Sequence, residues 1–261
     1  MKNFNFKTAT NIKEAVKLCS NKATFLAGGM TLLPAIKLRL AAYSDLVNIK
    51  KIKTLSGIKV SNKLLKIGST TTHYQVANSK EVGKSIPSLA ILAEGIGDPQ
   101  VRNRGTIGGS VANNDPAADY PSACLALNAI INTNKRKISA DKFFKGMFET
   151  DLKKGELIEN IEMEIPEKSA YAKFPNPASR YAIVGVYVAK LKKEIRVAVT
   201  GAMSCVFRSK EIESALEKNF SSSSIDSVNI SDKNFNSDIH ASAEYRAHMV
   251  KVMAKKAVSS C

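Results

Sequence analysis

The sequence of 261 residues predicts a mixed protein of helices and strands that divides into two domains near residue 166. Apolar residues recur at helical spacing close to both ends of the chain. Alternating apolar runs flank the turn "SNK" at residues 61–63, which is typical of two antiparallel strands. Beyond the proline-containing segment 167–180, further alternating runs over 180–207 indicate a second set of strands.

The first elements follow from local signals. Asn11 with Glu14 three residues later resembles a capping box, and apolar residues at helical spacing then predict a helix over 12–19. The remaining elements of this part are predicted as a strand running into the glycines at 23–29, a helix within 30–40 that has Pro34 in its first turn, and a strand over 45–52.

The middle of the chain continues with a strand, a turn and a strand over 57–68. Pro87 begins a helix that Gly95 can end, because glycine readily follows the last helical residue. The run from Leu157 to Ile165 alternates like a strand and stops at Pro166.

The C-terminal part begins with 167–180, where two prolines and weak periodicity mark the boundary. After the hairpin or meander of 180–207, we expect a helix, a long polar loop and a final helix, over 209–220, 220–238 and 242–258. Tyr245, Met249 and Met253 share one face of the final helix.

Composition limits the function classes. The formal net charge is +16, but the basic residues are spread along the chain and no aromatic residues interleave with them. We therefore expect a basic surface that is solvated or faces acidic partner subunits, and no nucleic-acid site. We expect no membrane span and no signal peptide, because no long apolar run is present. Four separated cysteines predict a reducing cytoplasm and no metal or iron–sulfur site in this chain.

Two glycine pairs are the main candidates for a binding site. Gly28–Gly29 and Gly108–Gly109 each adjoin an apolar run, and each has a hydroxyl residue shortly after it. Glycine permits close approach to the backbone, and consecutive free N–H groups form an anion-binding concavity. Two such loops can hold the two phosphates of a dinucleotide, although a simple turn is the alternative for either pair alone. Neither pair matches GxGxxG with a downstream acid, which argues against a Rossmann site.

These two loops also carry a family resemblance. "AGGMTLLPAIKLRL" and "DPQVRNRGTIGGSVANNDPAADYP" resemble the two FAD-binding loops of the flavoprotein (medium) subunit of molybdenum hydroxylases. This family includes the medium subunit of carbon monoxide dehydrogenase and the flavin domain of xanthine dehydrogenase. The resemblance continues through "GELIENIEMEIP", "YAKFPNPASRYAIVGVYVA" and "IHASAEYRAHMVKVMAKKAV", so it covers almost the whole chain.

The resemblance implies an α+β fold. Residues 1–166 would form an FAD-binding domain of the vanillyl-alcohol-oxidase type with two lobes, about 1–55 and 56–166. Residues 167–261 would form a C-terminal domain in which a three-stranded antiparallel sheet packs against helices. The boundary agrees with the break that the prolines indicate.

The resemblance also implies a set of cofactor contacts. The family positions that contact FAD correspond to Ala27, Gly28, Gly29, Met30, Thr31, Leu32, Ile96, Thr106, Ile107, Gly108, Gly109, Ser110, Asn113, Asp119, Leu157 and Lys173. The first loop would hold the diphosphate from one side. The second would offer backbone N–H groups and the hydroxyls of Thr106 and Ser110 from the other.

The remaining positions would contact other parts of FAD. Asn113 and Asp119 would approach the ribityl or adenosine portion, and Ile96 would pack on the cofactor. Leu157 and Lys173 would lie near the isoalloxazine ring. The family often has glutamine or histidine where this chain has Met30, serine where it has Thr31, and an aliphatic residue where it has Tyr120. None of these departures removes a glycine, so we expect FAD binding to persist.

The predicted function is electron transfer with no catalytic side chain, because the flavin supplies the chemistry. The resemblance implies a small [2Fe–2S] subunit and a large molybdenum-cofactor subunit as partners, in a dimer of heterotrimers that reduces an external acceptor. Two alternatives remain: a stand-alone FAD oxidoreductase of the same fold, and a basic protein that binds another anion or a nucleic acid.

Other candidate residues carry weaker signals. His73 is interpreted as structural, and Cys124 as a buried core thiol, because it lies in an apolar run. Asp98 and Arg102 are expected either to pair and order the loop before "TIGG" or to serve only as surface residues. No set of nucleophile, base and orienting residue is recognisable.

Overall fold

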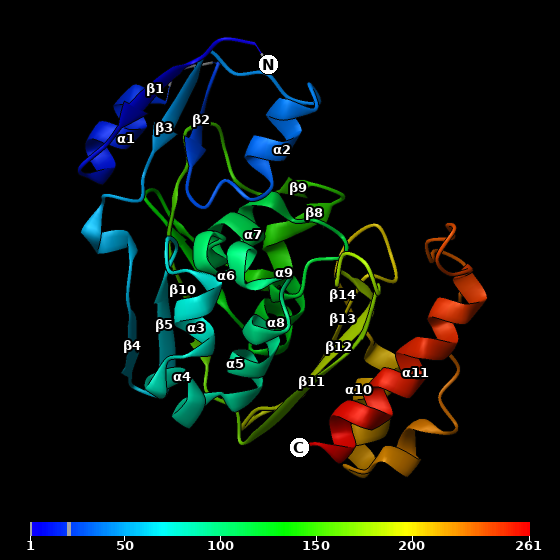
Figure 1. Ribbon diagram of the computed structural model, residues 1–261. Helices are drawn as coiled ribbons and strands as arrows, with labels where there is room; N and C mark the ends of the chain where they lie inside the picture. The colour runs from blue at the N-terminus through cyan, green and yellow to red at the C-terminus, as the bar shows by residue number, and fades with distance from the viewer. Residues whose placement is uncertain (1, 20–21) are drawn as a thin grey trace.

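The computed structural model describes residues 2–19 and 22–261. These residues form three larger sheets and one short hairpin, and the sheets follow one another along the chain (Figure 1). The first sheet lies at the N-terminal end of the molecule, the second in the middle, and the third carries the C-terminal helices on its outer face (Figure 1). The sequence therefore correctly predicted a mixed α and β protein with an antiparallel sheet in its C-terminal part.

The first sheet is parallel. Its strands are β1 (Asn5–Thr8), β2 (Ala23–Leu26) and β3 (Asp45–Asn48), in the order β1-β3-β2. Helices α1 (Ile12–Leu18) and α2 (Leu32–Lys37) connect them, as parallel pairing requires. Asn11 caps α1 as predicted, with its side chain accepting from the Glu14 N–H at 2.9 Å, but the Glu14 carboxylate accepts from the Thr10 N–H rather than from Asn11.

The second sheet is antiparallel and has five strands. They are β4 (Ile58–Ser61), β5 (Leu64–Gly68), β10 (Ile158–Glu164), β6 (Ile130–Thr133) and β7 (Lys137–Ser139), in that order across the sheet. The strand predicted up to Pro166 is β10, and it occupies the centre. The 3-10 helix η1 (Lys53–Leu55) links the first sheet to the second.

Short helices cover one face of this sheet. They are α3 (His73–Ala77), α4 (Lys80–Ser85), α5 (Pro87–Glu94), α6 (Pro99–Arg104), α7 (Ile107–Asn113), α8 (Tyr120–Ala126) and α9 (Ala140–Phe143). The hairpin of β8 (Phe144–Gly146) and β9 (Glu149–Thr150) follows α9. Cys124 in α8 is fully buried, as predicted, and burial raises the pKa of its thiol to about 12.

The third sheet consists of three long strands and a short fourth. They are β11 (Lys168–Pro175), β12 (Ala182–Lys190), β13 (Ile195–Thr200) and the two-residue β14 (Phe207–Arg208), all antiparallel. The C-terminal elements are α10 (Lys210–Lys218), the 3-10 helix η2 (Ser222–Ile225) and α11 (Ala243–Ser259). The resemblance implied three strands, and the structure adds β14 at the edge.

Both faces of this third sheet are covered. Tyr187 and Ala198 belong to the core shared with α5 and α8, whereas Val186 and Val197 belong to the core shared with α10 and α11. Figure 1 shows the sheet between these two pairs of helices. Eight of the nine residues of β12 are therefore buried. The sheet forms the wall between two hydrophobic cores, which fixes the position of the C-terminal part relative to the middle sheet.

Strand β11 is the main difference from the sequence prediction. The segment 167–180 was interpreted as an irregular boundary, yet Lys168–Pro175 is a regular strand of the third sheet. One face of β11 carries Ala170 and Ala172 and lies toward α11. The other face carries polar or charged groups and lies toward α5 and α8. Small residues on one face and buried polar residues on the other hide the usual alternation.

Helix α11 is the longest helix of the described residues, with 17 residues, and none of the helices they form has the length and apolar character of a membrane span. Its Met249 and Met253 are buried, whereas Tyr245 remains 42% exposed and its ring meets that of Phe174 in an edge-type contact.

His73 is buried and is held by contacts with its neighbours. Its backbone N–H donates to the Gly105 carbonyl at 3.0 Å, and its ring lies beside Tyr120 with centroids 5.3 Å apart. A side chain at Gly105 would come within 2.5 Å of His73 Nε2, so glycine is required there. Burial, with a smaller contribution from the charge of Arg102, lowers the pKa of His73 from 6.5 to about 4.

We predict that His73 makes the protein acid-sensitive. The unfolded chain binds a proton at His73 below about pH 6.5, whereas the folded chain does so only below about 4. The free energy of unfolding should therefore fall by up to roughly 3 kcal/mol as the pH drops through this window. Urea unfolding at a series of pH values should show this slope in the wild type. His73→Asn should remove it, and an unchanged slope in that variant would contradict the prediction.

Candidate functional site

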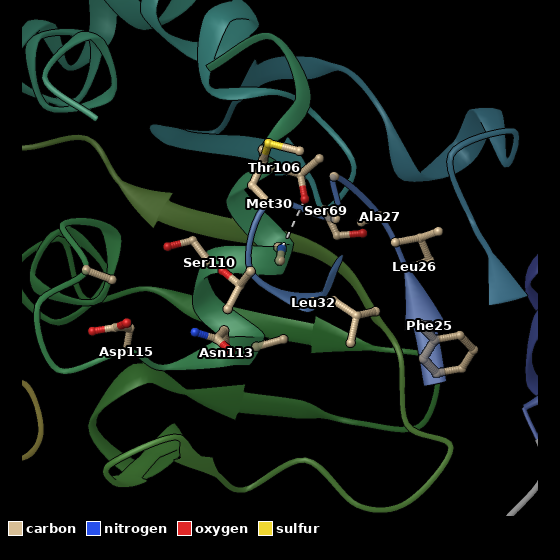
Figure 2. Close-up of a pocket in the computed structure, with 18 of the residues that line it drawn as sticks. Phe25, Leu26, Ala27, Met30, Leu32, Ser69, Thr106, Ser110, Asn113 and Asp115 are labelled. Atoms are coloured by element: carbon tan, nitrogen blue, oxygen red, sulfur yellow. Dashed lines mark hydrogen bonds between the residues drawn. The ribbon is translucent and has the colours of Figure 1, made fainter. Parts of the chain in front are cut away.

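A cavity of about 630 Å³ lies where the first sheet, the middle sheet and the C-terminal part meet (Figure 2). The first part of the chain contributes the segment from Thr24 to Leu32. The middle part contributes residues between Ser69 and Asp119 and the segment from Glu156 to Ile158. The C-terminal part contributes Ser179, Arg180 and Tyr181.

The first glycine loop follows β2 and packs directly on the backbone before α7. A Cβ atom at Gly28 would lie 2.3 Å from the carbonyl oxygen of Arg104 and 2.7 Å from the Cα atom of Gly105. Gly29 has a φ of 76°, a conformation that glycine adopts without strain. Both glycines are thus required by the geometry: the first by close approach and the second by its backbone angle.

This loop presents a run of free backbone donors. Among the described residues, none accepts a hydrogen bond from the N–H groups of the six consecutive residues 27–32, all of which line the cavity. The carbonyls of Gly29 and Thr31, by contrast, accept bonds from Leu33 and Ala35 at the start of α2. Consecutive unpaired N–H groups create a partial positive charge that suits an anion.

The second glycine loop differs, because its N–H groups are already used. Ile107 N–H donates to the Thr71 carbonyl at 3.1 Å, and Gly108 N–H donates to the Ser69 carbonyl at 2.9 Å. Gly109 N–H donates to Thr106 Oγ1 at 3.1 Å, which caps α7 (Figure 2). The expectation that both loops offer backbone donors therefore holds for the first loop only. The second loop lines the cavity with the hydroxyls of Thr106 and Ser110.

The two glycines of the second loop have different surroundings. A Cβ atom at Gly108 would lie 2.4 Å from the Cβ atom of Ser69, inside the protein. A Cβ atom at Gly109 would meet only Thr106 Oγ1, at 2.9 Å, and Gly109 is otherwise exposed. Gly108 thus permits the helix to pack on the strand end, whereas Gly109 keeps the cavity face open.

Asp119 also lines the cavity and is 5% exposed. Its Oδ1 atom accepts from the Tyr171 hydroxyl and lies 3.0 Å from Lys173 Nζ. Burial raises the pKa of the Asp119 carboxyl, although Lys173 and Tyr171 act in the opposite direction. No described residue donates to Oδ2, so this oxygen can accept a bond from a ligand.

Lys173 does not line the cavity. Its ammonium group donates to the Gly95 carbonyl at 2.8 Å, and the guanidinium of Arg102 donates to the next two carbonyls, Ile96 at 3.1 Å and Gly97 at 3.2 Å. Three successive carbonyls of one turn are thus held by two cations, which fixes Ile96 at the cavity wall. Arg102 makes no pair with Asp98, whose carboxylate instead caps α6 by accepting from Val101 N–H at 2.8 Å.

The remaining wall carries a buried carboxylate that is fully paired. Glu156 accepts from Arg136 at 3.0 and 3.1 Å, from the Thr133 hydroxyl at 2.7 Å and from the Lys153 N–H at 2.7 Å. Leu157 N–H donates to the Asn134 side chain at 2.9 Å. This network holds Leu157 rigidly at the cavity.

The structure gathers most of the predicted positions around this one cavity. All of the sixteen residues line it except Ile107, which is fully buried in the core, and Lys173. Ser69, Glu156 and Tyr181 also line the cavity and were not predicted. Ser69 and Tyr181 lie outside the glycine loops, and Glu156 adjoins the predicted Leu157, but no sequence spacing marks any of the three as a cavity residue. Among residues 2–19 and 22–261, no group of three or more His, Cys, Asp or Glu is arranged to hold a metal ion.

These features fit the diphosphate of FAD. Residues with free backbone donors and residues with hydroxyls line the same cavity, and two glycine contacts keep the walls close together. Apolar residues such as Phe25, Ile96 and Leu157 line other parts, and Asp119 can accept from a sugar hydroxyl. A dinucleotide requires this combination of an anion cradle and apolar walls.

Comparisons with known proteins agree with the geometry. The family described as "FAD binding domain in molybdopterin dehydrogenase" matches residues 2–168. The glyceraldehyde dehydrogenase medium chain of Sulfolobus acidocaldarius is 34% identical over 97% of this chain and 96% of its own length. The carbon monoxide dehydrogenase medium chain of Hydrogenophaga pseudoflava is 31% identical over 98% of this chain and 96% of its own length.

Solved structures show the same fold. A chain of the reconstituted CO dehydrogenase from Oligotropha carboxidovorans superposes with a TM-score of 0.91 at 27% identity, and the match covers 99% of this chain and 97% of that one. The family match, the relatives and the fold agree on one assignment, including FAD as cofactor and an oxidoreductase activity. The chain therefore belongs to the FAD-binding subunits of the molybdopterin dehydrogenases, the molybdenum hydroxylase family.

Proposed function

We propose that this subunit receives electrons at its FAD from a [2Fe–2S] cluster of a small partner subunit and passes them to an external acceptor. A large subunit with the molybdenum cofactor would oxidise the substrate. The observation that supports this most directly is the anion cradle of the first loop: residues 27–32 line a cavity with apolar walls, and their six N–H groups have no partner among the described residues. The relatives' designation as medium chains supports companion subunits.

The proposal gives each part of the cavity a role. The residues 27–32 would hold the diphosphate through backbone donors, and Thr106 and Ser110 would add hydroxyl donors. Asp119 would accept from a sugar hydroxyl, and Ile96 and Leu157 would pack against the apolar parts of the cofactor. Bound FAD would supply the redox chemistry, while the protein binds and orients it.

We also propose the domain division that the sequence suggests. An FAD-binding domain would comprise residues 1–166, with lobes of about 1–55 and 56–166, and a C-terminal domain would comprise 167–261. The support is that β10 ends at Glu164 and β11 begins at Lys168, and that the family match ends at residue 168. The complete assembly would be a dimer of heterotrimers.

The direct test uses the purified chain with and without its partner subunits. We expect one FAD per chain, and we expect the flavin absorbance to bleach under anaerobic conditions when substrate is added to the complex but not to the chain alone. Size measurement should show paired trimers. A chain that oxidises a substrate without partners would instead support a stand-alone oxidoreductase, and a chain that neither contains nor accepts FAD would overturn the proposal.

The two glycines of the second loop allow a matched prediction. Gly108→Ala should lower the free energy of unfolding by about 1–3 kcal/mol, because the new methyl group overlaps Ser69. Gly109→Ala should cost at most about 1 kcal/mol through the Thr106 cap, yet weaken FAD binding about tenfold by closing the cavity face. Gly83→Ala is the control, since its Cβ position is open. Equal FAD affinity in the Gly109 and Gly83 variants would contradict the assignment of this face to FAD.

Lys173→Met should destabilise the fold in a pH-dependent way. The substitution leaves the Asp119 carboxylate buried without its cation, which costs about 3 kcal/mol. The pKa of Asp119 then rises further, so the loss should be larger at pH 8 than at pH 5, where the carboxyl can take up a proton. Urea unfolding of the double variant Lys173→Met/Asp119→Asn should recover most of the loss. A loss that is equal at both pH values would show that charge burial is not its cause.

A further inference from the structure

Ser69 carries a buried hydroxyl that the fold leaves without a partner. The residue follows directly after β5, is 4% exposed and lines the cavity (Figure 2). Among the described residues, its Oγ atom has no hydrogen-bond partner. A buried polar atom left unpaired costs about 1–3 kcal/mol, and folded proteins leave few of them. The position therefore points to a partner outside the protein's own side chains and backbone.

The backbone holds Ser69 in place. Its N–H donates to the Glu159 carbonyl at 3.0 Å, and its carbonyl accepts from the Gly108 N–H at 2.9 Å. Its Cβ atom lies so close to Gly108 that a Cβ atom there would be only 2.4 Å away. The backbone and the Cβ atom of Ser69 are thus fixed beneath the first turn of α7.

The neighbouring groups identify the kind of partner. Ser69 lines the same cavity as the free N–H groups of residues 27–32 and the hydroxyls of Thr106 and Ser110. These groups share one property, which is that they donate to an anion. The backbone N–H of Ser69 is already bonded to the Glu159 carbonyl, so the hydroxyl is the donor that Ser69 can offer to a ligand.

We propose that the Ser69 hydroxyl donates a hydrogen bond to the diphosphate of bound FAD and so forms a third contact segment beside the two glycine loops. This inference rests on the proposed placement of FAD in the cavity. It predicts that removal of the hydroxyl has opposite effects on the free energy of unfolding in the two states. The change should stabilise the flavin-free chain, where Oγ is unpaired, and destabilise the FAD-bound chain.

The test compares Ser69→Ala with the wild type and with Ser209→Ala, a buried serine outside the cavity. FAD and riboflavin, which lacks the diphosphate, are titrated into the flavin-free chain by fluorescence, and melting temperatures are recorded with and without saturating FAD. We expect Ser69→Ala to weaken FAD binding about tenfold, to leave riboflavin binding unchanged, and to melt no lower than the wild type without flavin. Ser209→Ala should leave both affinities unchanged.

The other outcomes separate two failures. Unchanged FAD affinity in Ser69→Ala would overturn the contact, as would an equal loss for FAD and riboflavin, which would place the hydroxyl away from the diphosphate. A wild-type chain that binds no FAD would instead overturn the cofactor site itself, and the Ser69 contact with it. Far-UV circular dichroism of the variant confirms that its fold is retained in each comparison.

Discussion

The close approach of backbone segments at two glycines is the constraint on which the site depends. Gly28 places the loop after β2 against the backbone of Arg104 and Gly105, and Gly108 places α7 against the end of β5. Any side chain at either position would force these segments apart, because it would overlap backbone atoms or the Cβ atom of Ser69, none of which can rotate away. The first contact joins the first sheet to the middle part, and the second sets the depth of the cavity between them.

The second contact explains why the two loops offer different donors. The segment from Ser69 to Thr71 accepts the first N–H groups of α7, so the helix is fastened to the middle sheet through the same groups that would otherwise face a ligand. Fastening makes this wall rigid, and the wall then meets the cavity with side chains such as those of Thr106, Ser110 and Asn113. The first loop makes no such bonds through its N–H groups, which remain free for an anion. Rigidity and backbone donation are therefore divided between the two loops.

Much of this arrangement follows from the sequence, and the exceptions have physical reasons. The glycine pairs and the hydroxyl residues beside them were sufficient to predict both loops as candidate binding segments. Fourteen of the sixteen predicted positions line the cavity. Ile107 does not, because the first turn of a capped helix points one side chain into the core. Ser69 escaped notice because its importance depends on a contact with a residue 39 positions later, between elements that the sequence cannot place. Strand β11 was missed because buried polar side chains replace its apolar alternation.

Strand β11 also shows why the C-terminal part belongs to the site although it contributes little of the cavity surface. Tyr171 and Lys173 reach across to Asp119, and Lys173 continues to the Gly95 carbonyl, so a single strand orients both the carboxylate and the turn that carries Ile96. Ser169 on the same face contacts Ser88, which also bonds to Tyr187 at 2.6 Å. These buried polar contacts require a fixed register between the third sheet and the helices of the middle part. A shift of β11 by one residue would turn Lys173 away from Asp119 and would release Ile96, so the cavity geometry depends on the docking of the C-terminal sheet.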